Sequence, residues 1–191
     1  MEQITQKKLY LVSGRVSEPL AHEVADLMGE ELGEPNLAEF SNGEIHCKFS
    51  ESIRGSDVFI LQTHCHTEEI SINDALMEQL IMVDAAKRAS AKRITVVCPH
   101  YGYARQDRKS SGREPITAKL VANLFKGAGA SRLIGVDLHS GQIQGFFDGP
   151  VDHLTAMPVL VERLKSLEGD LAIVSPDAGR VKVAERYAMQ L

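Results

Sequence analysis

The stretch VVCPHYGYARQDRKSSGREP, residues 96–115, decides how the rest of the chain is interpreted. Val96 and Val97 end an apolar run that is typical of a strand buried on both faces. Two tyrosines follow, and then a cluster of cations between Arg105 and Lys109. Ligands of open α/β sheets bind beyond the carboxyl ends of the strands. The stretch therefore predicts a buried strand that ends in an anion-binding loop.

Similar apolar runs recur along the chain and alternate with helical patterns, which predicts an α/β fold with a parallel sheet. The predicted strands are Lys8–Ser13, Leu37–Phe40, Ile45–Phe49, Val58–Gln62, Ile94–Cys98, Leu133–Leu138 and Leu171–Ser175. The predicted helices are Pro19–Met28, Asn73–Ala89, a helix from Pro115 to Gly127, His153–Leu167 and Ala178–Leu191. The pair Asn42-Gly43 lies between two strand-like runs and predicts a β-hairpin.

Composition excludes several classes of protein. The 191 residues carry 26 acidic against 21 basic side chains, a net charge of −5, whereas a dedicated nucleic-acid binder is usually basic. The cations of 105–113 are thus a local feature of an acidic body, which favours one small anion as ligand. No apolar run is long enough for a membrane span or a signal peptide. The three scattered cysteines imply no disulfide framework, and we expect a cytoplasmic protein.

Three predicted strand ends carry reactive groups, in the segments CPHYGYARQDRK, VDLHS and VSPDAG. Their chemistry suits a nucleotide with magnesium. Arg105 is able to lie over a purine or bind phosphate, and Gln106 to pair with a base edge. His139 and Asp177 are candidate ligands of Mg²⁺, which takes few protein ligands and keeps several waters. Asp137 precedes His139 by two residues, so a continuing strand would place both on one side.

Each segment taken alone also has a structural explanation. A cation-rich run is often a solvated loop, a histidine at a strand end is often a hydrogen-bonded structural residue, and an aspartate before Ala-Gly is often a helix cap. The segment His64-Cys65-His66 has the look of a metal pair, but a structural role is favoured there. Neither GxxxxGK[ST] nor GxGxxG occurs, which excludes the P-loop and the Rossmann fingerprint.

Taken together, GYARQDRK, SPDAG and the 137–152 segment DLHSGQIQGFFDGPVD resemble the ribose-phosphate pyrophosphokinase family. The resemblance runs from about Leu9 to Leu191. It implies a phosphoribosyltransferase-like (type I) domain with a β-hairpin flap over residues 1–152. It also implies that residues 153–191 are the truncated start, the first βα unit, of a second similar domain.

The family resemblance implies an enzyme that moves the diphosphoryl group of Mg-ATP to the 1-hydroxyl of ribose 5-phosphate. It further implies a cytoplasmic homo-oligomer, a hexamer, that uses Mg²⁺ and binds neither nucleic acid nor membrane. The implied ATP-binding residues are Phe40, Asn42, Gly43, Glu44, Arg105 and Gln106, and the implied metal residues are His139, Asp177 and Asp137. Many members have Asp-Gly-Glu where this chain has Asn42-Gly43-Glu44.

Two loops of the family are not found among these 191 residues. One is a Lys/Arg loop expected soon after the SPDAG segment, and the other is an acidic loop that cradles ribose 5-phosphate. The catalytic residues are therefore not assigned, and we expect the 191 residues alone to be inactive. The alternative is a non-catalytic, nucleotide-binding regulatory member of the family. A phosphoribosyltransferase is a third interpretation, but that class lacks GYARQDRK.

Overall fold

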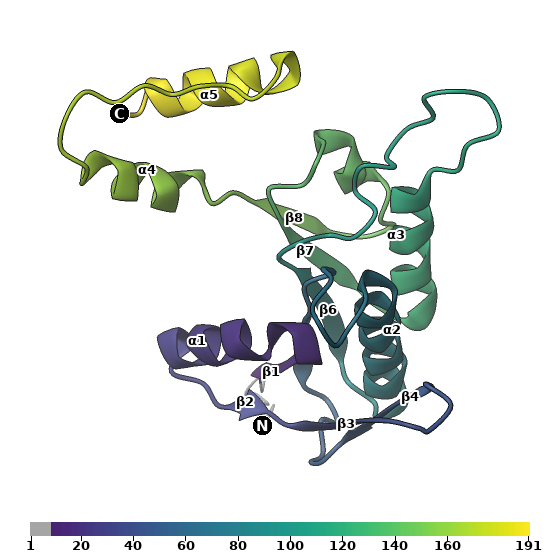
Figure 1. Ribbon diagram of the computed structural model, residues 1–191. Coiled ribbons are helices and arrows are strands. Elements are labelled where there is room, and N and C mark those ends of the chain that lie inside the picture. Colours follow the sequence, from purple (N-terminus) through teal and green to yellow (C-terminus); the bar gives the residue numbers. More distant parts are fainter. Residues whose placement is uncertain (1–8) are drawn as a thin grey trace, which may run out of the picture. The chain divides into compact units, whose positions relative to one another are not determined.

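The computed structural model describes residues 9–191, and its main sheet has six parallel strands (Figure 1). Its strand order is β2-β1-β5-β6-β7-β8, and every neighbouring pair is parallel. The strands are β1 (Leu9–Ser13), β2 (Leu32–Gly33), β5 (Asp57–Leu61), β6 (Arg93–Cys98), β7 (Arg132–Val136) and β8 (Val151–Leu154). Because all strands run the same way, the loops that follow them share one edge of the sheet.

Helices cover both faces of this sheet. Figure 1 shows α1 (Glu18–Met28) on one side and α2 (Ile72–Arg88) and α3 (Thr117–Ala128) on the other. A capping box begins α2: the Ser71 hydroxyl accepts a hydrogen bond from the Asp74 amide, and the Asp74 carboxylate accepts one from the Ser71 amide. Val12, Ile60 and Val96 have no exposed surface, so the core lies between the central strands and the helices.

A separate two-stranded antiparallel sheet is formed by β3 (Pro35–Glu39) and β4 (Ile45–Phe49). It confirms the predicted hairpin. The Gly43 amide donates to the Phe40 carbonyl over 2.8 Å, and Gly43 has a φ of 87°, which favours glycine. The hairpin contacts α2 through β4, so it is attached to the same helix that covers the main sheet.

Some predicted boundaries are wrong. The third helix begins at Thr117 rather than Pro115, and it continues through Gly127 to Ala128, with Gly129 as its C-cap. Gly129 has a φ of 128°, so the left-handed backbone that ends a helix falls there. The fourth predicted helix begins late, at α4 (Met157–Lys165), because residues 151–154 form β8 at the edge of the sheet. This edge strand is short and half polar, and so lacks a strand-like pattern.

The chain divides into two compact units, of which the first ends at Leu154 and the second is Thr155–Leu191. The second unit contains α4, a single 3₁₀ turn at Ala178–Arg180 and α5 (Val181–Ala188). The predicted strand Leu171–Ser175 is not formed, because no strand in residues 155–191 is there to pair with it. That these residues begin a second phosphoribosyltransferase-like domain stays a prediction. None of the helices in residues 9–191 is long and apolar enough to cross a membrane.

Candidate functional site

The loops that follow β6 and β7 meet at the carboxyl edge of the sheet. The two strands are neighbours, with Cys98 opposite Gly135. Beyond them, the Asp107 carboxylate accepts hydrogen bonds from the Ser140 hydroxyl over 2.5 Å and from the Gln142 amide over 2.9 Å. Gln142 also donates to the Asp107 carbonyl over 3.1 Å. Asp107 thus joins the loop that carries Arg105 to the loop that carries His139.

Sequence reasoning missed Asp107, although it lies inside the quoted RQDRK run. Asp107 is only 7% exposed, whereas the charged residues on either side of it are exposed. The hydrogen bond from Ser140, followed by that from Gln142, lowers the pKa of the Asp107 carboxyl, so the group stays ionised at neutral pH. An aspartate between cations was a signal that this side chain makes an internal contact, but the sequence did not indicate Ser140 and Gln142 as its partners.

Arg105 and Gln106 are exposed at the end of a turn that begins at Gly102. The Gln106 amide donates to the Tyr103 carbonyl over 2.9 Å, and the Gln106 carbonyl accepts from the Ala118 amide over 3.1 Å. The backbone of Gln106 is therefore fixed between the turn and the start of α3. Tyr101 is buried, and its hydroxyl donates to the Ala118 carbonyl over 2.9 Å. Tyr101 therefore supports the loop from the inside and is not exposed to a ligand.

Asp137 and His139 are both exposed, and the buried Leu138 lies between them. Asp137 and His139 do not lie on a continuing strand, because β7 ends at Val136 and Asp137 has a φ of 45°, so strand alternation does not place them on one side. Their position is instead fixed by the backbone. The Asp137 amide donates to the Leu154 carbonyl over 2.9 Å, and the Leu138 amide donates to a ring nitrogen of His153 over 3.0 Å.

This donor set fits a magnesium ion that is held mainly by nucleotide phosphates. Among the residues that the structure describes, no group of three or more His, Cys, Asp or Glu side chains is placed to hold a metal. Mg²⁺ is commonly bound through one or two carboxylates together with substrate phosphates and water. Asp137 supplies one carboxylate at this edge, and His139 is available beside it for a direct or water-mediated contact.

The candidate residues of the hairpin form a second group. Phe40, Gly43 and Glu44 line a cavity of about 440 Å³ whose other wall is α2, with Met77 and Ile81. The Asn42 side-chain oxygen accepts a hydrogen bond from the Glu44 amide over 3.2 Å. None of the interactions described within residues 9–191 joins this group to Arg105 or Gln106.

Asp177 lies in the second unit, and so the structure does not place it relative to His139. Its carboxylate accepts a hydrogen bond from the Arg180 amide over 3.1 Å at the start of the 3₁₀ turn. The structural explanation of this residue, a helix cap, is therefore present. Its metal role stays a prediction.

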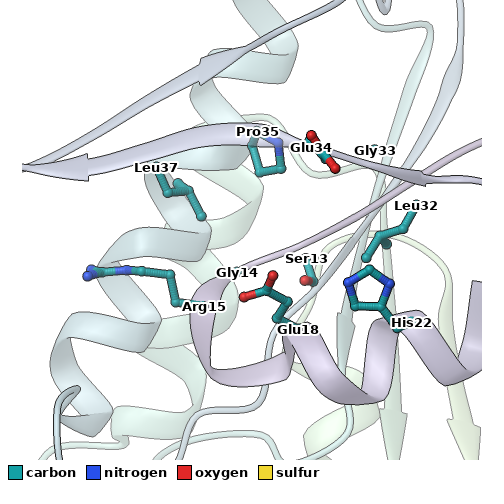
Figure 2. Close-up of a pocket in the computed structure, with 10 residues that line it drawn as sticks. All are labelled: Ser13, Gly14, Arg15, Glu18, His22, Leu32, Gly33, Glu34, Pro35 and Leu37. Atoms are coloured by element: carbon teal, nitrogen blue, oxygen red, sulfur yellow. The ribbon is translucent and has the colours of Figure 1, made fainter.

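A further cavity, of about 320 Å³, lies beyond the carboxyl end of β1, between α1 and the start of β3 (Figure 2). Figure 2 shows the Arg15 side chain extending away from Glu18 and His22. Its guanidinium donates to the fully buried Glu78 over 2.5 Å and lies 3.5 Å from Glu39 in β3. Arg15 thus connects α2 to the turn end of the hairpin, where Glu39 is the last residue of β3, a link that sequence analysis did not predict.

His64 is a structural residue, as the sequence analysis favoured. It is fully buried, and its two ring nitrogens are engaged by the Gly102 amide and by Gln79. Burial lowers the pKa of His64 to about 4, while the hydrogen bond with Gln79 opposes that shift. Both ring nitrogens are taken, so His64 is not half of a metal pair with His66.

We expect the protein to lose stability in mild acid because of His64. The pKa of His64 is about 4 in the folded protein, against about 6.5 when unfolded. Between these values the unfolded state binds more protons, so the free energy of unfolding falls as pH decreases. From pH 7 to pH 5 the His64 contribution is about 2 kcal/mol. Urea unfolding of the wild type and of His64→Gln at both pH values measures it, and equal pH losses in the two proteins would contradict this prediction.

The fold and the carboxyl edge of the sheet define the class of protein. It is a parallel α/β protein with two polar loops joined at the carboxyl ends of neighbouring strands, and with a β-hairpin that contacts α2. Residues 9–129 match the family model described as the N-terminal domain of ribose phosphate pyrophosphokinase. The chain belongs to the ribose-phosphate pyrophosphokinase family.

Curated relatives support this assignment over nearly the whole chain. Ribose-phosphate pyrophosphokinase from Bifidobacterium longum is 54% identical over 189 residues, which cover 97% of this chain and 54% of the relative. The protein of the same name from Corynebacterium glutamicum is 53% identical, with 97% and 57% covered. The crystal structure of phosphoribosylpyrophosphate synthetase from Mycobacterium smegmatis matches with a TM-score of 0.89 and 51% identity, over 96% of this chain and 61% of that one. The chain spans just over half the length of these curated relatives.

Proposed function

We propose that the full-length protein containing these residues transfers the diphosphoryl group of Mg-ATP to the 1-hydroxyl of ribose 5-phosphate. The hydroxyl oxygen forms a bond to the β-phosphorus, the bond from that phosphorus to the bridging α-β oxygen breaks, and the hydroxyl proton is released. The products are 5-phosphoribosyl 1-pyrophosphate and AMP. Family membership carries this proposal, together with the Asp107 bridge that gathers the two polar loops at one edge.

The proposed nucleotide contacts follow from exposure and chemistry. Arg105 and Gln106 are exposed on a loop with a fixed backbone, where Arg105 is placed to bind phosphate. The Gln106 side-chain oxygen accepts a hydrogen bond from the Thr117 hydroxyl over 2.5 Å, which leaves the side-chain N–H groups of Gln106 for a base edge. In the hairpin, Phe40 offers an aromatic face that is 56% exposed. The Asn42 oxygen already accepts from Glu44, but a carbonyl oxygen has two lone pairs and so accepts a second donor, such as an adenine amino group.

Magnesium would be held by Asp137 and His139, with Asp177 as a third candidate from the second unit. When bound with ATP, the ion neutralises charge on the phosphates. The residues of the chain hold the two loops in place and present the ligands. In particular, the ionised Asp107 fixes Ser140 next to His139 and so limits how far that loop departs from Arg105.

The reaction is tested by its products. The full-length protein is incubated with ATP, magnesium and ribose 5-phosphate, and the nucleotides are separated. AMP formed in a 1:1 ratio with phosphoribosyl pyrophosphate supports the proposal, and ADP with a phosphorylated sugar refutes it. ATP binding without any turnover would favour the non-catalytic regulatory member instead.

Replacing His139 with Ala should lower turnover of the full-length protein at least about 100-fold. Changes to residues that only support metal ligands typically cost about 10–100-fold, and a direct contact is worth no less. Because His139 is exposed, the fold should change in stability by no more than about 0.5 kcal/mol. His66→Ala removes another exposed histidine on a neighbouring loop and serves as the control. Unaltered magnesium dependence in His139→Ala would exclude a metal role.

We further propose that the protein is a cytoplasmic homo-oligomer, a hexamer, as the family resemblance implies. The half-exposed Phe40 and the cavity beside it place an apolar surface on the hairpin, which is suited to a contact between subunits. Light scattering on the purified full-length protein measures the mass of the assembly. A monomer at micromolar concentration would contradict this part of the proposal.

A further inference from the structure

The loop from Pro99 to Gln106 carries Arg105 and Gln106, and it needs an anchor. Tyr103, in the middle of this 99–106 loop, has a φ of 61°. A side chain other than glycine in this left-handed region costs about 1 kcal/mol or more, so the conformation persists only when its surroundings impose it. The residue just before Tyr103 is Gly102, whose amide donates to Nδ1 of His64 over 3.0 Å.

The protonation of His64 follows from its partners. An amide N–H only donates, so Nδ1 of His64 is the acceptor and the proton of the neutral ring is on Nε2. Nε2–H then donates to Oε1 of Gln79 over 2.8 Å. The Gln79 amide group donates in turn to the carbonyls of Ile60 over 2.8 Å and Val97 over 3.3 Å. This chain of hydrogen bonds connects β5, β6 and α2 to the 99–106 loop.

The residues packed around the His64 ring hold it in place. The ring is fully buried and stacks on Phe125, with centroids 5.8 Å apart and an interplanar angle of 16°. The His64 amide also donates to the His100 carbonyl over 3.1 Å, so backbone and ring both hold the loop. A Cβ on Gly102 would lie 2.9 Å from Cβ of His64, which shows how closely the loop approaches the ring.

We propose that His64 is a positioning residue that sets the 99–106 loop through its hydrogen bond with Gly102 and so presents Arg105 and Gln106 to the nucleotide. This role rests on the proposed function, because nucleotide binding at Arg105 and Gln106 is part of that proposal. His64 itself does not touch the nucleotide. Nδ1 of His64 accepts the hydrogen bond of the Gly102 amide, a role that a backbone carbonyl would have inside the sheet.

Two substitutions separate the two hydrogen bonds of the ring. In His64→Asn the side-chain oxygen lies near the position of Nδ1, which keeps the acceptor for Gly102 and loses the contact with Gln79. In His64→Gln the longer side chain reaches toward Gln79 and leaves the Gly102 amide without its partner. Both variants remove the buried ring and its stacking on Phe125, so both lose stability. Only His64→Gln should release the loop.

The experiment measures KM for ATP, kcat and hydrogen exchange of the Gly102 amide in the full-length proteins. For His64→Gln we expect KM for ATP to rise about tenfold, the size of one lost hydrogen bond, with a smaller change in kcat. Exchange at Gly102 should accelerate by a similar factor. His64→Asn should stay within about threefold of the wild type in both measurements. If His64 had only a structural role, KM for ATP and the exchange rate at Gly102 would change to the same extent in both variants.

A glycine pair covers the case in which a His64 variant does not fold. Gly102→Ala drives its Cβ into His64 and should reproduce the rise in KM. Gly112→Ala, where a Cβ meets nothing within 4 Å, is the matched control in the neighbouring loop. Equal KM values for all four variants, or unchanged exchange at Gly102 in His64→Gln, would overturn the proposal. If the wild type binds no ATP, the proposed function fails, whereas the exchange data still test the anchor.

Discussion

The 191 residues on their own should form AMP from ATP and ribose 5-phosphate at least about a thousandfold more slowly than the full-length protein. Phosphoryl-type transfer depends on positioning and on neutralising charge, and a single supplied arginine is worth about 10³–10⁵ in rate. The family resemblance places a Lys/Arg loop and the ribose 5-phosphate cradle outside these residues. Residues 155–191 contain two helices and no strand, so they present no sheet edge of their own for the sugar phosphate.

The assay compares AMP release by both proteins at saturating ATP, magnesium and ribose 5-phosphate. A binding measurement with ATP alone accompanies it, because Arg105, Gln106 and His139 are all present in the shorter chain. Weak ATP binding with almost no turnover is the expected pattern. Turnover within tenfold of the full-length protein would show that the catalytic groups lie inside residues 1–191, and the site assignment would then be wrong.

The central strands were predictable from the sequence because burial on both faces makes them continuous apolar runs. The run Ile94–Cys98 became β6, and the run from Leu133 became β7. An apolar run is not sufficient, however, since a strand exists only when another strand pairs with it. Leu171–Ser175 has such a run and no partner in its unit, whereas Val151–Leu154 has a weak pattern and becomes a strand because β7 is beside it.

The candidate site was predictable in part for the same reason. Strand ends are visible in a sequence, so Arg105 and His139 could be named as candidates, and parallel pairing brings the loops that carry them to one edge of the sheet. Asp107 and His64 were not identified as supports of the site, because their partners lie 33 and 38 residues away, at Ser140 and Gly102. Contacts of that kind depend on the register of neighbouring strands, which local patterns do not contain.

Glu78 presents the same difficulty, since nothing in an amphipathic helix pattern predicts a carboxylate in its buried face. Glu78 has no exposed surface, and its carboxylate accepts three hydrogen bonds. The donors are the Arg15 guanidinium over 2.5 Å, the Arg15 amide over 2.8 Å and the Gln62 side chain over 2.9 Å. A buried charge is tolerated when it is paired and hydrogen-bonded in this way.

Arg15→Met should therefore lower the free energy of unfolding by about 3 kcal/mol. Methionine keeps most of the apolar stem but leaves the Glu78 carboxylate buried without a cation, and breaking a buried pair from one side costs about 3–5 kcal/mol. The lower end applies because 32% of the Arg15 side chain is exposed. The salt bridge with Glu39 adds little, since Glu39 is exposed and the two charged groups are 3.5 Å apart.

Urea unfolding of the wild type, Arg15→Met, and the double variant Arg15→Met/Glu78→Gln tests this account. Glutamine keeps an oxygen for the Arg15 amide and the Gln62 side chain but carries no charge, so the double variant should regain most of the lost stability. Arg88→Met is the matched control, because the Arg88–Asp84 pair is exposed and its loss should cost no more than about 0.5 kcal/mol. If the double variant is no more stable than Arg15→Met, the loss came from packing of the arginine stem, and the buried charge of Glu78 is not what Arg15 stabilises.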